Sequence, residues 1–108
     1  MNAKRLNRPP KRHAPPRHLD KTEADLWRSI IRDYDFDDDA SLALLATAME
    51  ARQRARKCRE RIDVDGEAVR DRFGQVKAHP LLNAERDARA AFLAAMRVLN
   101  LDLGKGNQ

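Results

Sequence analysis

The sequence predicts an all-α fold: a three-helix domain with a short hairpin or loop between helices 2 and 3, preceded by a disordered basic arm. Apolar residues recur at helical spacing in three segments of the 108-residue chain. Four of the five prolines lie before the first segment, and Gly66 and Gly74 interrupt the pattern between the second and third. These observations divide the chain into an arm over 1–18, a helical domain over 19–101 and a polar tail over 102–108.

The arm is basic and carries no compensating acid. Residues 1–18 contain six Lys and Arg side chains and no Asp or Glu, whereas the rest of the chain holds 16 bases and 17 acids. Its prolines fix φ and remove backbone donors, which favours an extended or disordered segment. A cationic arm ahead of a nearly neutral body is typical of segments that bind phosphate. We therefore expect nonspecific DNA affinity to come first from Lys4, Arg5, Arg8, Lys11, Arg12 and Arg17.

The first helix is expected over roughly residues 20–34. Asp20 opens it, Glu23 follows three residues later and Leu19 precedes it, which is typical of a capping box with an apolar staple. Apolar side chains then follow at helical spacing, at Ala24, Trp27, Ile30, Ile31 and Tyr34. The pattern places Trp27 in the core or in a subunit contact.

An acidic run over residues 33–39 precedes the second helix. Aspartates at alternate positions from Asp33 suggest a calcium loop, but the glycine and the bidentate glutamate that an EF-hand needs are replaced by Asp38 and Leu44. No metal site is therefore predicted. One of the three aspartates at 37–39 is instead expected to cap the helix, whose amino end favours negative charge.

The second helix is expected over about 39–62, and a seam of mostly small side chains runs along it. The seam comprises Leu44, Ala48, Ala51, Ala55, Cys58 and Ile62. Small side chains let a second helix approach closely, from the same chain or from a neighbouring subunit. Bases flank the seam on both sides, with Arg52, Arg56 and Arg59 on one and Arg54, Lys57 and Arg61 on the other. Two interpretations stay open: a solvated helix end whose cations complement the dipole, or a second phosphate-facing surface at Arg52, Arg56 and Arg59.

Glycines and a proline organise the remainder of the domain. Val69 and Val76 lie on either side of Gly74, which favours a short β-hairpin or an ordered loop. Pro80 suits the first turn of the third helix, and His79 just before it is expected in the cap region. The third helix carries its apolar face at Leu81, Leu82, Ala84, Ala88, Ala91, Phe92, Ala95, Met96 and Leu99. Among these, Phe92 and Met96 are expected in the core or in a subunit contact.

The sequence lacks the patterns that are typical of several other kinds of protein. Cys58 is the single cysteine, so an intrachain disulfide is not possible and a reducing, cytoplasmic location is expected. No apolar run resembles a secretory signal or approaches the length of a membrane span. A Gly-rich phosphate loop and a nucleophile beside an oriented base are also missing. We therefore predict a protein that is not an enzyme and that uses no cofactor.

The order of these features resembles the phage terminase small subunits encoded by many siphophages and prophages. The resemblance covers about residues 15–101 and depends on ordered spacing rather than on one specific motif. It comprises "HL", a Trp on the first helix, "DDAS" at the start of a long helix, two glycines, and "KAHP" before a last helix ending "LNL". The residues are His18, Leu19, Trp27, Asp38, Asp39, Gly66, Val69, Gly74, Lys77, His79, Pro80 and Leu99.

This resemblance implies a non-enzymatic DNA-packaging factor in the host bacterial cytoplasm. Such subunits form homo-oligomeric rings, bind double-stranded viral DNA and deliver it to the large terminase subunit, which carries the ATPase and the nuclease. Two alternatives stay open: an oligomeric adaptor that binds a protein partner without recognising DNA, and a general nucleic-acid-binding protein. A nuclease using the aspartates of residues 33–39 is a more remote alternative.

Overall fold

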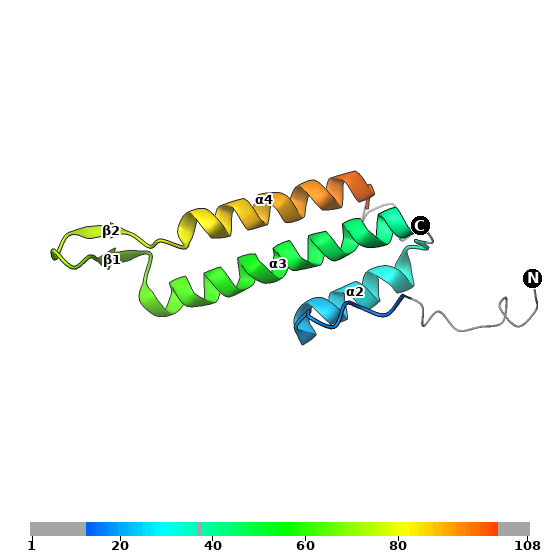
Figure 1. Cartoon of the computed structure of the whole chain (residues 1–108), viewed down its shortest axis with the longest axis horizontal. Coiled ribbons are helices and arrows are strands. Elements are labelled where there is room, and N and C mark those ends of the chain that lie inside the picture. Colours follow the sequence, from blue (N-terminus) through cyan, green and yellow to red (C-terminus); the bar gives the residue numbers. More distant parts are fainter. Residues whose placement is uncertain (1–12, 37, 102–108) are drawn as a thin grey trace, which may run out of the picture.

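The computed structural model describes residues 13–36 and 38–101. They form three helices and a two-stranded antiparallel hairpin between the second and third helices, which confirms the predicted fold class (Figure 1). In chain order the elements are α2 (Lys21–Asp33), α3 (Asp39–Asp65), β1 (Ala68–Arg70), β2 (Val76–Ala78) and α4 (Leu82–Leu99).

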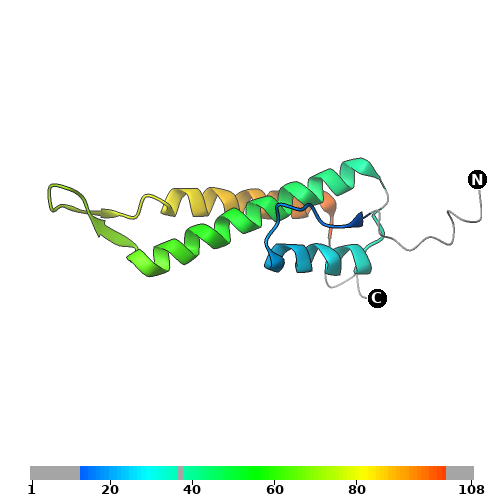
Figure 2. The ribbon, with the colours of Figure 1, turned by 60° about the horizontal axis from the view of Figure 1, so that its bottom comes forward.

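The 27-residue helix α3 is the spine of the fold. Helix α4 packs antiparallel along one side of α3, and α2 lies against the amino-terminal half of α3 (Figures 1 and 2). The hairpin extends beyond the opposite end of α3, away from α2 (Figure 1). One end of the molecule is therefore a packed three-helix core, and the other is a slender projection.

The core gathers where all three helices meet. Trp27 of α2 is 4% exposed, and Leu45 and Met49 of α3 are fully buried beside it. Ala95 closes the cluster from α4, with Phe92 and Met96 partly buried against it. Burying these side chains provides the main driving force that holds α2 and α4 onto α3.

The small-residue seam of α3 lies in the interior. Its buried members are Ala48, Ala51, Ala55, Cys58 and Ile62. Leu44 is only half-buried, and the large apolar side chains at this level of the helix come instead from Leu45 and Met49. The small side chains let α4 lie close to α3 along most of its length (Figure 1).

The starts of α2 and α3 differ from each other. The Asp38 carboxylate accepts the Ser41 backbone N–H at 2.9 Å, so Asp38 is the residue of the acidic run that caps α3. Asp20 occupies the N-cap position of α2, but within the described residues its side chain accepts no N–H from that helix. The capping box expected at Asp20 and Glu23 is thus wrong, because both carboxylates bind Arg56, whose charged guanidinium is the stronger donor.

The ends of α3 and α4 are set by backbone geometry. Helix α3 continues to Asp65, beyond the expected end near 62, and stops at Gly66 with a positive φ of 91°. His79 then lies before α4, where its Nδ1 accepts the Leu81 backbone N–H at 3.0 Å, in the cap role expected for it. Helix α4 ends at Leu99, and the C-cap residue Asn100 has a left-handed φ of 59°.

Candidate nucleic-acid interface

The last residues of the basic arm are packed onto the helices. The indole Nε1 of Trp27 donates to the backbone carbonyl of His13 at 2.6 Å, and Leu19 is buried. His18 Nε2 lies 2.7 Å from a Glu50 carboxylate oxygen on α3. Residues 13–18, which the sequence assigns to the arm, therefore contact the helices of the folded body. The buried indole needs an acceptor for its N–H, and the arm supplies it.

Of the six arm residues that the sequence assigns to DNA binding, one lies within the described residues. Arg17 is exposed, in a turn that ends at the buried Leu19. The other assigned cations lie outside the described residues: Lys4, Arg5, Arg8, Lys11 and Arg12. Gln53 of α3 further fixes the junction, because its Oε1 accepts the Asp20 backbone N–H at 2.6 Å. The chain thus enters the folded body at a defined place on α2 and α3.

Arg56 is the centre of an ion-pair cluster between α2 and α3. Its guanidinium donates to both oxygens of Glu23, at 2.7 and 3.0 Å, and the Glu23 side chain is fully buried. It also donates to Asp20 at 2.9 Å and to Glu60 at 3.0 Å. These hydrogen bonds, that to Glu23 foremost, raise the pKa of Arg56. The arginine joins the two helices through charge-assisted bonds.

Arg59 forms the equivalent cluster between α3 and α4. It donates to the two Glu85 oxygens at 2.7 and 2.9 Å, and Glu85 also accepts from Arg89 at 2.7 Å. Asp63 and Glu67 complete the cluster at 3.3 and 3.4 Å. The hydrogen bonds from Arg59 are the main cause of the lowered pKa of Glu85.

These clusters bear on the interpretation of the α3 bases. Arg56 and Arg59 are engaged by carboxylates, so DNA binding by these two side chains remains a prediction alongside a clear structural role. Arg52 is different: its guanidinium lies 5.4 Å from the centre of the Phe92 ring and has no carboxylate partner among the described residues. It borders a cleft of about 210 Å³ together with Ala55, Arg56, Arg59, Arg89 and Phe92.

A second groove of about 450 Å³ lies on the other flank of α3. It is lined by His18, Glu50, Gln53, Arg54, Lys57, Cys58 and Leu81. Lys57 lies 3.4 Å from Asp20, and Arg61 farther along the same flank binds Asp65 at 2.8 Å. Lys57 and Arg61 are thus each close to a carboxylate, whereas Arg54 has no carboxylate partner among the described residues.

The hairpin between α3 and α4 is a feature that the sequence does not mark as a functional site. Its strands pair Ala68 with Ala78 and Arg70 with Val76. At the turn, one Asp71 carboxylate oxygen accepts the backbone N–H groups of Phe73 and Gln75, at 2.8 and 3.0 Å. These backbone hydrogen bonds, the one from Gln75 first, lower the pKa of Asp71. The turn is therefore a defined structure rather than an unconstrained loop.

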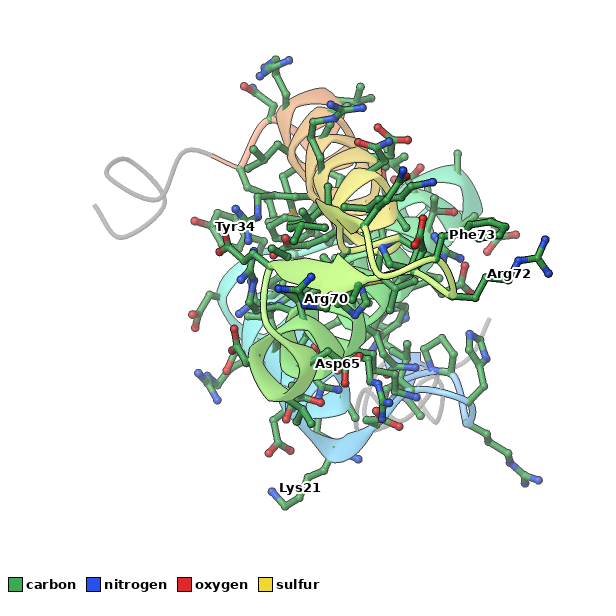
Figure 3. The ribbon with its side chains drawn as sticks, turned by 90° about the vertical axis from the view of Figure 1, so that its left-hand side faces the viewer. Lys21, Tyr34, Asp65, Arg70, Arg72 and Phe73 are labelled. Atoms are coloured by element: carbon green, nitrogen blue, oxygen red, sulfur yellow. The ribbon has the colours of Figure 1, made fainter. Side chains whose placement is uncertain are left out.

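The turn presents an aromatic ring and cations to solvent. Phe73 is 74% exposed, and the Arg72 guanidinium lies 5.0 Å from the centre of its ring. Figure 3, viewed from the hairpin end, shows Phe73 and Arg72 projecting on the same side of the ribbon while Arg70 lies at the hairpin itself. Arg70 donates to the Gly74 carbonyl at 2.8 Å. In the sequence, the only signal of this surface is an aromatic residue beside a turn glycine, flanked by arginines.

His79 fixes the root of the hairpin. Its side chain is buried, its Nδ1 accepts from Leu81, and its Nε2 lies 2.8 Å from an Asp65 oxygen. Because Nδ1 is an acceptor, the proton is assigned to Nε2, which donates to Asp65. This hydrogen bond is the main cause of the lowered pKa of Asp65. The end of α3 and the start of α4 are thus tied together where the hairpin leaves them.

Stability is expected to fall as the solution becomes acidic. Within residues 13–36 and 38–101, six carboxyl groups have a pKa below their ordinary values of 3.8 for Asp and 4.5 for Glu: Asp20, Asp25, Asp38, Asp65, Asp71 and Glu85. A carboxyl with a lowered folded pKa stabilises the fold above its unfolded pKa, and the contribution is lost as pH falls through the folded value. Urea midpoints should therefore be level above about pH 5 and decrease below about pH 4. A midpoint that rises on acidification would contradict these pairings.

Metal binding and membrane insertion find no support in residues 13–36 and 38–101. No group of three or more His, Cys, Asp or Glu side chains in these two ranges is arranged to hold a metal ion. None of the helices in this part of the chain combines the length and apolar character needed to cross a bilayer.

Two apolar side chains of α4 are exposed. Leu93 is 51% exposed and Val98 is 72% exposed. At 3.6 residues per turn, their spacing of five residues puts them on different sides of the helix. They are therefore two separate exposed apolar side chains rather than one apolar face.

Comparisons with family models, curated proteins and solved structures gave no match for this chain.

Proposed function

We propose that this chain is a non-enzymatic DNA-packaging factor, a small terminase subunit that binds duplex DNA and delivers it to a large ATPase and nuclease subunit. The observation that carries the proposal is the segregation of charge. Residues 1–18 hold six bases without an acid, whereas the rest of the chain holds 16 bases and 17 acids. Four of the six bases that the sequence marks on α3 are paired with carboxylates. The excess of positive charge along the sequence therefore lies in residues 1–18, and such a segment is attracted to phosphate.

Oligomerisation would make such an arm effective. A single short cationic segment binds phosphate weakly, and its contacts are screened by salt. In a ring, each copy contributes one arm, and once one is bound the others act at high effective concentration. The packed junction at His13 and Trp27 fixes where each arm leaves the body. The body would then act as a rigid carrier that sets the positions of the arms around the DNA.

Removing the arm's charge is expected to weaken DNA binding and its salt dependence. The variant replaces Lys4, Arg5, Arg8, Lys11 and Arg12 with glutamine in the full chain. For every phosphate that the variant no longer neutralises, the slope of log K against log salt should become shallower by about 0.9. Binding to a duplex is measured by fluorescence anisotropy across a salt series, with the mass of the protein recorded by light scattering.

The matched control removes the same charge from the helices. It replaces Lys21, Arg28, Arg32, Arg86 and Arg97, all exposed, with glutamine. If the arm is the DNA grip, the control variant keeps most of the affinity and the slope. If both variants lose the same amount of DNA affinity, binding depends on net charge alone and not on the arm. If the unmodified full chain does not bind DNA, the DNA-binding proposal is wrong. Stimulation of a large terminase ATPase by the full chain distinguishes packaging from general nucleic-acid binding.

Two exposed apolar side chains of α4 favour a second candidate, an oligomeric adaptor that binds a protein partner without DNA recognition. Leu93 and Val98 present apolar surface that the described chain leaves uncovered. This candidate requires that the arm variant keep its function and that polar substitutions at Leu93 and Val98 abolish it. The two candidates therefore make opposite predictions for the same pair of variants.

A further inference from the structure

The β-hairpin contributes little to the core of the protein. Every residue of β2 is exposed, and in β1 only Val69 is partly buried. Val76 is 62% exposed and Phe73 is 74% exposed, so the apolar side chains of the hairpin lie largely in solvent. An aromatic ring that contributes nothing to the core is available to a partner.

The turn holds the backbone that carries this ring in a defined conformation. Asp71 accepts the Phe73 and Gln75 backbone N–H groups, and the Gly74 N–H donates to the Asp71 carbonyl at 2.9 Å. Gly74 has a φ of 80°, a conformation that side-chain-bearing residues rarely adopt. Because the turn is already ordered, a contact made by Phe73 costs little conformational entropy on binding.

The charges around the ring favour an anionic partner. Arg70, Arg72 and Lys77 lie on the hairpin, and Arg72 stacks on Phe73. The two acids of the hairpin are engaged: the Asp71 carboxylate by backbone N–H groups and Lys77, and Glu67 at the root by Arg59 at 3.4 Å. The outer surface of the tip therefore presents guanidinium groups beside an apolar ring.

We infer that the hairpin tip is a second duplex-DNA contact, in which Phe73 enters the minor groove as a wedge between base steps while Arg70 and Arg72 bind the flanking phosphates. This inference rests on the proposed DNA-binding function and assigns a distinct role to the hairpin. The arm supplies charge alone, whereas an apolar wedge partly unstacks base pairs and bends the duplex. A two-stranded ribbon with a projecting side chain has a suitable shape for entering a groove.

The test measures DNA bending and affinity with the full chain. A duplex carrying a fluorescent donor at one end and an acceptor at the other reports bending by energy transfer, and anisotropy reports affinity. Phe73→Ala should abolish most of the bend and weaken binding roughly tenfold, the effect typical of losing one aromatic–base stack. Phe73→Leu should keep part of the bend, because aliphatic wedges also unstack base steps. Arg72→Ala should reduce the salt slope by about 0.9.

Val98→Ala is the matched control, since Val98 is 72% exposed, close to the 74% of Phe73, but lies on α4. The inference is supported if Phe73→Ala abolishes the bend and Val98→Ala keeps it. It is overturned if the full chain binds DNA through its arm and both variants bend the duplex as the unmodified chain does. It is also overturned if Phe73→Ala disrupts binding to a large terminase subunit while DNA bending is unchanged. Failure of the full chain to bind DNA would remove the proposed function and this inference together.

Discussion

Replacing Trp27 with alanine is expected to lower the free energy of unfolding by about 3–5 kcal/mol, the range for truncating a buried aromatic side chain. The indole is 4% exposed and packs where all three helices meet. The substitution also removes the hydrogen bond to the His13 carbonyl. Because small domains are stable by only about 5–15 kcal/mol, the variant should lose a large part of the free energy of unfolding.

Urea unfolding followed by far-UV circular dichroism measures this effect, since the substitution removes the single tryptophan and its fluorescence. Trp27→Phe is the matched control: it retains a buried aromatic ring but lacks the N–H donor. It should show a much smaller decrease in stability than the alanine variant. An unchanged urea midpoint in Trp27→Ala would contradict the position of Trp27 in the core.

Arg56→Ala is expected to destabilise the protein by about 3 kcal/mol, because it leaves the fully buried Glu23 carboxylate without its cation. The guanidinium is 27% exposed and binds three carboxylates, so its removal also breaks the ion pairs with Asp20 and Glu60. Chemical denaturation of the variant measures the destabilisation. Arg28→Ala, which breaks only an exposed pair with Asp25, is the control and should change stability little.

A double variant separates the cost of burying the Glu23 charge from the stabilisation that the Glu23–Arg56 ion pair provides. In Glu23→Leu with Arg56→Met, both charges are replaced by apolar side chains of similar size, which often recovers or exceeds the original stability. We therefore expect the double variant to be clearly more stable than Arg56→Ala. A double variant as unstable as the single one would mean that the ion pairs of Arg56 with the outer acids, rather than the burial of Glu23, dominate.

Much of the fold could be predicted from local sequence patterns. Helical spacing of apolar residues specified α2 and α4, and the lack of Gly or Pro across α3 specified its length to within one turn. Gly74 between two valines indicated the hairpin. These signals depend on residues within a few positions of one another, which is why they can be identified in a single sequence.

The ion pairs between helices could not be predicted in this way. Glu23 and Arg56 are 33 positions apart, and Arg59 and Glu85 are 26 apart, so no local spacing connects them. The capping-box pattern at Asp20 and Glu23 indicated a different partner, and the long-range guanidinium replaced it. The sequence alone therefore does not reveal that Arg56 and Arg59 of α3 form ion pairs with carboxylates of the neighbouring helices.

The candidate DNA-binding site could also be predicted only in part from the sequence. Charge segregation in residues 1–18 is visible in composition, but the anchoring of residues 13–18 depends on an indole that lies 14 positions away from its acceptor. The exposure of Phe73 could not be inferred either, because an aromatic residue in a short apolar pattern is usually buried. In the structure the hairpin extends beyond the end of α3 (Figure 1), and the Phe73 side chain in its turn is largely exposed.

The order in which the helices pack has a consequence for how quickly the chain folds. Helix α2 packs on α3, its neighbour in sequence, and α3 packs on α4 across the hairpin that connects them. The first contacts between consecutive helices can form beside the segments that connect them, without closure of a long loop, and helical bundles are associated with folding in microseconds to milliseconds. Each newly synthesised chain can therefore complete its helical body rapidly.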